Sequence, residues 1–236
     1  ADTNFTLIYF GLKMKFHKIL KNDEFKWYLS SIASVILFLT LLLSFSNNIS
    51  FLSAFRKISF QVVSIITTTG YATADYTTWG YFMSFIFFLF LFSGGSAGST
   101  SGGIKIVRII IIIKNGLLEF KRRLHPKAVI PVTLNGSAIS NQIIYNLLAF
   151  IFLYLFIFTL GSILLTALGV EFLTSISAVA SAIGNVGPGI AQVGPSYSFD
   201  HIPFLGKWIL SLLMLMGRLE LFTVCLIFTP YFWKRI

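Results

Sequence analysis

Charged residues are scarce in this sequence, and their scarcity excludes a soluble domain. Only 11% of the 236 residues are Asp, Glu, Lys or Arg, whereas 56% are hydrophobic and the mean hydropathy is +0.85. A water-soluble domain of this length needs far more charge on its surface. The chain is therefore predicted to be an integral membrane protein, with the bilayer as its solvent.

Cysteine pairs, clustered histidines and catalytic motifs are also missing. Cys225 is the one cysteine, so no disulfide can form within the chain. His17, His125 and His201 are scattered without the spacing of a zinc site. No nucleophile–base pair, phosphate-binding loop or dinucleotide fingerprint appears. We expect no enzyme activity and no covalently bound cofactor.

Long apolar runs are what the sequence does contain. Each of four runs can cross about 30 Å of hydrocarbon as a helix, at about 1.5 Å per residue. The runs are Trp27–Phe45, Tyr81–Phe92 continuing through Ile104–Ile113, Ile143–Leu168 and Trp208–Phe228. The sequence has no starting Met and no signal-peptide pattern, so it looks like a segment of a longer protein.

The net charge of +10 is concentrated at alternate ends of these runs, which argues for membrane orientation and against nucleic-acid binding. Four helices that cross in turn would bring the basic clusters to one side, and the positive-inside rule makes that side the cytoplasm. Both termini of the segment and the middle linker are then cytoplasmic. The clusters are Lys13, Lys15, Lys18, Lys21 and Lys26; Lys114, Lys121, Arg122, Arg123 and Lys127; and Lys234 and Arg235.

Between the spans, each half of the chain carries a short apolar stretch that leads into a glycine-containing polar run. The stretches Ala54–Ile66 and Glu171–Ile183 are each about 13 residues, too short to cross a bilayer but long enough for a re-entrant helix. The polar runs are SIITTTGYATADY at 64–76 and GNVGPG at 184–189. Ordinary external loops also collect such residues, but they need no apolar helix before them.

The spacing of these features indicates an internal repeat. Gly70 and Gly187 are 117 residues apart, and so are Trp27 and Ile144, where the first span of each half begins. We therefore expect an all-α integral membrane protein with two tandem helix–pore-loop–helix repeats. Its parts are a cytoplasmic N-terminal segment (1–26), the first repeat (27–113), a cytoplasmic basic linker (114–140) and the second repeat (141–236).

Such a pore loop is suited to a cation. A short helix entering from outside turns its negative C-terminal end toward the membrane centre. The chain then returns outward with carbonyls that can replace the hydration shell of an ion, and glycine permits the backbone angles required. The predicted selectivity filter comprises Thr68, Thr69, Gly70 and Tyr71 from the first repeat and Asn185, Val186, Gly187 and Pro188 from the second.

Thr68–Tyr71 resembles the potassium-channel filter, and the whole chain resembles the C-terminal half of a Trk/Ktr/HKT potassium transporter, specifically repeats three and four of a TrkH-like subunit. The motifs that carry this resemblance are TNF at 3–5, TTTGYATADY at 67–76, SGGSAGSTSGGIKIVR at 93–108, GNVGPG at 184–189, GRLELFTV at 217–224 and FTP at 228–230. The resemblance implies potassium as the transported ion, bound at filter carbonyls. Glycine at both filter centres implies selection against sodium, because serine there is associated with sodium passage in this family.

The second span of the first repeat is expected to break. Ser93–Gly103 contains five glycines and four serines, and glycine costs about 1 kcal/mol per residue in a helix relative to alanine. Packing of small residues against a neighbouring helix is the alternative. The residues predicted to form a gate at this break are Ser93, Gly94, Gly95, Gly98, Gly102 and Gly103.

Arg218 is the second predicted gate element. It lies as deep in the last span as Ser93 lies in the second span of the first repeat. A charge at that depth must face a cavity or a partner, so Arg218 is expected either to repel potassium in the pore or to pair structurally. Residues two apart on a helix face different sides, so Arg218 is free to face the pore while Glu220 is expected to pair with Lys105 or Arg108 across the bundle. Snorkelling to the cytoplasmic interface is the alternative role of those two cations.

The resemblance also implies that the protein lies in the bacterial inner membrane. Its implied partners are membrane lipid, a second copy in a homodimer, the missing N-terminal repeats and a cytosolic nucleotide-binding regulatory subunit. The basic segment Lys114–Lys127 is a candidate docking surface for that subunit or for anionic lipid. Two other functions remain open. One is a two-repeat channel that completes its pore by dimerisation, and the other is a non-conducting structural membrane protein.

Overall fold

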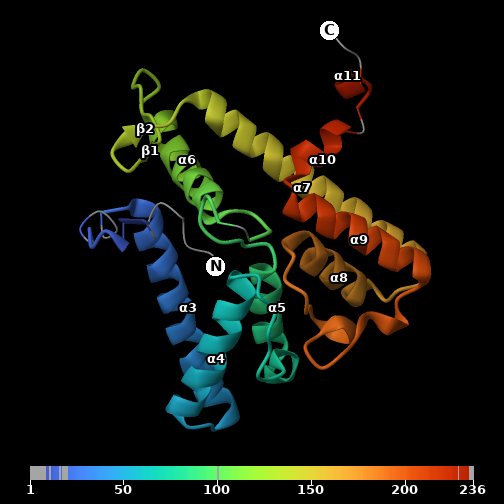
Figure 1. Ribbon diagram of the computed structural model, residues 1–236. Coiled ribbons are helices and arrows are strands. Elements are labelled where there is room, and N and C mark those ends of the chain that lie inside the picture. Colours follow the sequence, from blue (N-terminus) through green and yellow to red (C-terminus); the bar gives the residue numbers. More distant parts are fainter. Residues whose placement is uncertain are drawn as a thin grey trace.

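The computed structural model of the chain is mostly helical and describes residues 9–10, 12–15, 17, 21–99, 101–227 and 229–233 (Figure 1). The TNF motif, Lys18, Thr100, Phe228, Lys234 and Arg235 lie outside the described residues. The main helices are α3 (Asp23–Asn47), α4 (Phe51–Ile66), α5 (Tyr81–Phe90), α6 (Ile106–Leu124), α7 (Asn141–Ala167), α8 (Phe172–Gly184), α9 (Phe204–Arg218), α10 (Leu221–Ile227) and α11 (Pro230–Trp233). Short 3-10 helices η1 (Tyr76–Trp79), η2 (Ala191–Val193) and η3 (Phe199–His201) and a hairpin of β1 (Thr133–Leu134) and β2 (Ser137–Ala138) complete the described elements.

Helices α3 and α7 are long and apolar enough to cross a membrane. Both begin slightly before the apolar runs that predict them, since α3 starts at Asp23 and α7 at Asn141. The Asn22 side chain fixes the start of α3 by accepting a hydrogen bond from the Phe25 amide. Each long helix is followed by a short one, α4 or α8, so that the order of elements in the two halves is the same (Figure 1).

The helix predicted over Tyr81–Ile113 is broken where the glycines are concentrated. Helix α5 ends at Phe90 and α6 begins only at Ile106. Helix α6 then continues to Leu124, so the first part of the linker predicted at 114–140 is helical. A hairpin follows, with Asn135 and Gly136 both at positive φ, as a two-residue turn requires.

The prediction of one continuous last span over Trp208–Phe228 is wrong. Helix α9 ends at Arg218, and α10 leaves it at an angle of 115°. Glu220, at a φ of +64°, adopts a left-handed conformation that ends the helical path. Leu221 on the far side of the bend is buried, so the bend is anchored in the core. The expectation that Arg218 and Glu220 occupy different faces of one helix is therefore also wrong, because Glu220 lies beyond the end of the helix that contains Arg218.

The two halves share core packing at the centre of the molecule. Buried side chains of α3, α4 and α5 form one apolar cluster with Ala180, Val186 and Ile190 of the second half. Tyr76 lies in this cluster, fully buried and stacked on Phe87 with ring centroids 4.7 Å apart. Its hydroxyl donates a 2.6 Å hydrogen bond to the Gly189 carbonyl, which joins the return segments of the two repeats.

Replacement of Tyr76 by Phe tests this joint. The variant retains the ring packing but leaves the buried Gly189 carbonyl without its donor, a loss of about 1–3 kcal/mol. We expect a lower midpoint of thermal unfolding in detergent. Tyr145→Phe serves as the matched control, because the Tyr145 ring is 65% exposed. Equal midpoints for Tyr76→Phe and the control would contradict a structural role for this hydrogen bond.

Candidate functional site

The first predicted filter segment begins where α4 ends. Thr68 and Gly70 both have positive φ, at +49° and +73°, so the chain turns sharply away from the helix axis. Ser64, in the last turn of α4, holds the turn from within: its carbonyl accepts from the Thr69 amide, and its hydroxyl donates to the Tyr71 carbonyl at 2.6 Å. Gln61, one turn earlier, donates to the Ala74 carbonyl at 2.8 Å.

The second predicted filter segment has the same construction after α8. Asn185 and Gly187 have positive φ, at +55° and +112°. Ser181 holds this turn, because its hydroxyl donates to the Gly187 carbonyl at 2.7 Å and accepts from the Gly187 amide. Asn185, Gly187 and Ser181 lie 117 positions after Thr68, Gly70 and Ser64, respectively. This separation equals the repeat length predicted from the sequence.

The two turns lie against each other, and glycine is required where they meet. A Cβ atom on Gly70 would overlap the Val186 carbonyl oxygen and approach the Pro188 ring. The positive φ of Gly70 adds conformational strain for any other residue. Both predicted filter segments therefore belong to one site, formed by the ends of two short helices.

Several carbonyls in these turns are uncommitted. Within the described part of the chain, the carbonyls of Thr68, Thr69 and Gly70 accept no hydrogen bond, and neither do those of Asn185 and Val186. Peptide oxygens buried without donors are costly in a membrane protein unless a cavity, water or an ion meets them. The arrangement can therefore offer oxygen ligands to a desolvated cation.

The glycine-rich segment at 93–103 forms a loop that closes on itself at its base. The Gly94 amide donates to the Ile104 carbonyl, and the Ile104 amide donates to the Phe92 carbonyl, each at 2.9 Å. Lys105 lies at the start of α6, and its ammonium group turns back into the loop. It donates to the carbonyls of Ser99 and Ser101 and to their hydroxyls.

This loop packs on the inner end of α8, directly beside the second filter turn. A Cβ atom on Gly102 would overlap the Gly184 carbonyl and touch Asn185, so only glycine permits the approach. Helix α9 also contacts this turn, because the side-chain amide of Asn185 donates to the Met214 carbonyl at 3.0 Å. The segments predicted as filter and gate are thus in contact.

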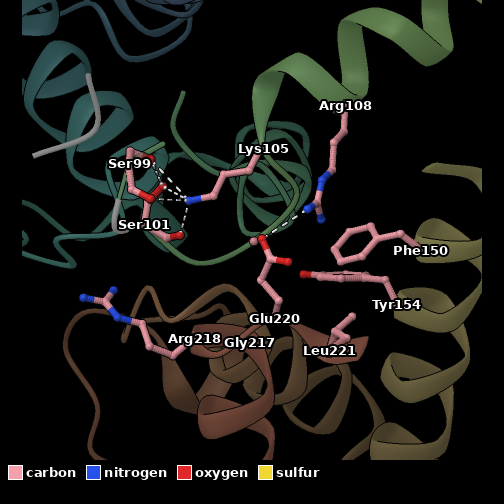
Figure 2. A pocket seen from close by; sticks show the side chains of 11 residues that line it. Ser99, Ser101, Lys105, Arg108, Phe150, Tyr154, Gly217, Arg218, Glu220 and Leu221 are labelled. Carbon is pink, nitrogen blue, oxygen red and sulfur yellow. Dashed lines mark hydrogen bonds and ion pairs between the residues drawn. The ribbon is translucent and has the colours of Figure 1, made fainter. Parts of the chain in front are cut away.

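Arg218, Lys105, Arg108 and Glu220 line one cavity of about 110 Å³ together with Ser99 and Ser101 (Figure 2). Arg108 is the cation that Glu220 contacts, at 3.2 Å between Nη2 and Oε1. The Arg108 guanidinium also lies 3.9 Å above the centre of the Phe150 ring. Figure 2 shows the Arg218 side chain directed away from that ion pair, on the side of the loop serines.

Two features of this region were not found from the sequence. Tyr154 is buried at the wall of the cavity, and its hydroxyl has no hydrogen-bond partner among the described residues. The Glu24 carboxylate accepts a hydrogen bond from the Ala97 amide at the tip of the glycine-rich loop. No sequence signal could have found the second contact, because 73 residues separate its partners.

On the opposite side of the filter turns, Asp75 caps η1 and is held as a carboxylate. Burial alone would raise the pKa of Asp75, but hydrogen bonds from the Thr77 hydroxyl and amide and from Ser196 outweigh it and lower that pKa. Ser196 belongs to the return segment of the second repeat. The Asp75 carboxylate is therefore fixed by hydrogen bonds from both repeats, whereas a solvated loop carboxylate would have no such partners.

The fold and the site together define a class. Spanning helices that alternate with short helices, each ending in a turn with free carbonyls, are typical of membrane proteins that transport cations. The TrkH family model, described as a cation transport protein, matches residues 24–235. The chain belongs to this family, which consists of transporters and not of enzymes.

Similar proteins include the Trk system potassium uptake protein TrkH of Halomonas elongata, 36% identical over 91% of this chain, and that of Escherichia coli K12, 34% identical over 91%. The crystal structure of the potassium transporter TrkH from Vibrio parahaemolyticus matches 99% of this chain with a TM-score of 0.91 at 34% identity. The chain covers 44% of each of the two sequence relatives and 50% of the crystallised chain, and so spans about half their length.

Replacement of Gly70 by Ala tests the contact between the two turns. The added methyl group meets the Val186 carbonyl and strains the backbone, so we expect a lower unfolding midpoint and loss of ion binding. Gly116→Ala is the matched control, since nothing lies within 4 Å of its Cβ position in α6 and alanine favours helix. Bound potassium or rubidium can be measured by isothermal calorimetry. Wild-type binding in Gly70→Ala would show that the turns do not need this contact.

Proposed function

We propose that this chain supplies two of the four pore-loop repeats of a potassium uptake protein. In this proposal the ion crosses the membrane between the filter segments Thr68–Tyr71 and Asn185–Pro188 and their counterparts in the other repeats. The observation that carries the proposal is the pair of equivalent turns with free carbonyls at the ends of α4 and α8. The relatives of this chain are named as potassium uptake proteins, which supports potassium as the ion.

The filter is proposed to act by replacing water around the ion. Potassium loses its hydration shell only where several fixed oxygens substitute for it. Ser64 and Ser181 orient the backbone from behind, so that the oxygens hold their positions without an ion to organise them. The C-terminal ends of α4 and α8 add the negative end of each helix dipole at the same place.

The glycine-rich loop and Arg218 are proposed to close the path below the filter. The loop lies against Gly184 and Asn185, at the inner end of the second turn. Arg218 lines the same cavity as the loop, and a fixed positive charge there opposes the passage of a cation. Opening then requires the loop to leave its place and Arg218 to move from the path or be neutralised.

The remaining assembly is proposed by analogy with the family. The protein acts in the bacterial inner membrane as a homodimer, with both ends of this segment and the basic linker on the cytoplasmic side. A cytosolic nucleotide-binding subunit regulates it. The exposed basic residues in the last turn of α6 and just after it, which include Lys121, Arg123 and Lys127, are available to such a subunit or to anionic lipid.

Rubidium uptake by the full-length protein, in a bacterial strain without its own potassium systems, tests the proposed function. We expect uptake that rescues growth at low potassium and discriminates against sodium. No uptake from correctly inserted protein would favour a structural role. Uptake by this chain expressed without any preceding repeats would instead support a two-repeat channel that completes its pore by dimerisation.

Arg218→Ala tests the gate. Removal of the guanidinium lowers the electrostatic barrier, so we expect basal potassium flux to rise by about tenfold or more, since each 1.36 kcal/mol of barrier is tenfold in rate. Flux is measured in liposomes with the purified full-length protein. Lys207→Ala, which removes an exposed charge from the first turn of α9, should leave flux unchanged. Unchanged basal flux in Arg218→Ala would show that this residue does not obstruct the path.

A further inference from the structure

Glu24 lies in the first turn of α3 and is almost completely buried, with 5% of its surface exposed. Its Oε1 atom accepts a 2.6 Å hydrogen bond from the Ala97 amide. Ala97 is at the tip of the glycine-rich loop, at the far end from the base formed by Gly94 and Ile104. One buried carboxylate thus holds the tip of the loop that the proposed function assigns to the gate.

The burial of Glu24 is more than helix capping requires. An acidic residue in the first turn is stabilised by the helix dipole, but it gains that stabilisation while it is exposed to water. Among the residues that the structure describes, no lysine or arginine lies within ion-pairing distance of Glu24. Burial of a carboxylate without a cation is costly and needs compensating donors. The Ala97 amide is such a donor, and a bond to a charged acceptor is stronger than a neutral one.

The neighbouring Asp23 faces a different part of the chain. Its amide donates to Oδ1 of Asn135 at 2.7 Å, and its carboxylate accepts from the Asn135 amide at 2.9 Å. Asn135 is in the turn of the β1–β2 hairpin, on the side that the basic residues mark as cytoplasmic. The hairpin is itself fixed to α6 by a hydrogen bond from Lys114 to the Thr133 carbonyl.

We propose that Glu24 is a positioning residue that latches the glycine-rich loop in the position described here, and that Asp23 connects this latch to the cytoplasmic hairpin. The first turn of α3 then connects the loop beside the filter with the hairpin, which is a surface that a cytosolic protein can reach. Displacement of the hairpin shifts the start of α3 and weakens the hold on Ala97. The role in ion flux rests on the proposed function, whereas the latch itself does not.

Hydrogen–deuterium exchange in the full-length protein tests the latch without reference to transport. In Glu24→Ala the Ala97 amide loses its acceptor, and we expect peptides that cover Ser96–Ser99 to exchange about tenfold faster or more. Glu24→Gln keeps an acceptor oxygen but loses the charge, so an intermediate increase is expected. Glu119→Gln, an exposed carboxylate on α6, is the matched control and should leave these peptides unchanged. Exchange at the wild-type rate in both Glu24 variants would overturn the latch.

Potassium flux from the same preparations separates the latch from the gate. We expect basal flux to rise in Glu24→Ala and to rise less in Glu24→Gln. Faster exchange at Ala97 with unchanged flux would retain the latch and contradict the loop as a gate. Failure of Glu24→Ala to fold leaves Glu24→Gln to decide, because that variant preserves the shape of the side chain.

Asn135→Gly tests the connection to the hairpin. Glycine accepts the positive φ of Asn135 but removes the side-chain acceptor for the Asp23 amide. We expect faster exchange in the hairpin and a smaller increase at Ser96–Ser99. An increase confined to the hairpin would overturn the connection while the result for Glu24 still stands.

Discussion

The structure depends on a constraint that lipid imposes on the backbone: a peptide group inside the membrane must find its hydrogen-bond partner within the protein. Two helices of this chain end in sharp turns, and in each the helix supplies a serine to hold the turn. Ser64 and Ser181 occupy equivalent positions and bond to the backbone that follows. What they leave unsatisfied is a small set of carbonyls grouped in one place. These unpaired carbonyls therefore lie together at a point where an ion can be their partner.

The first filter turn, the glycine-rich loop and α9 all pack against the inner end of α8, with backbone directly against backbone. Gly70 lies against the Val186 carbonyl, Gly102 against the Gly184 carbonyl and Gly217 against the Ile183 carbonyl. Close packing of this kind leaves no room for a side chain, and protein interiors accommodate extra atoms only with strain. The glycines of the loop therefore serve two purposes. They break the helix, as their low helix propensity predicts, and they allow the loop to pack directly beside the filter turn.

Sequence reasoning could locate the spans, the turns and the break because each leaves a local signal: apolar length, glycine, and a repeat of 117 residues. The bend after Arg218 has no such signal. Leu219 and Glu220 are ordinary helix formers, and the left-handed Glu220 is stabilised by burial of Leu221 and by its ion pair with Arg108, a residue 112 positions away. The contact between Glu24 and Ala97 is equally non-local. Local patterns predict elements, whereas partners of this kind depend on how those elements pack.

The arrangement of charge around the cavity distinguishes Arg218 from the two other cations that line it. Three cationic side chains line the cavity, and two of them are compensated by the chain. Lys105 is surrounded by the carbonyls and hydroxyls of Ser99 and Ser101, and Arg108 is held between Glu220 and the face of Phe150. Arg218 alone of the three makes no hydrogen bond or ion pair with any described residue. An uncompensated cation exerts a larger field than a compensated one, so we propose that Arg218 supplies the barrier to potassium. In the proposed gate, movement of the loop alters that barrier by changing how much water surrounds the Arg218 guanidinium group.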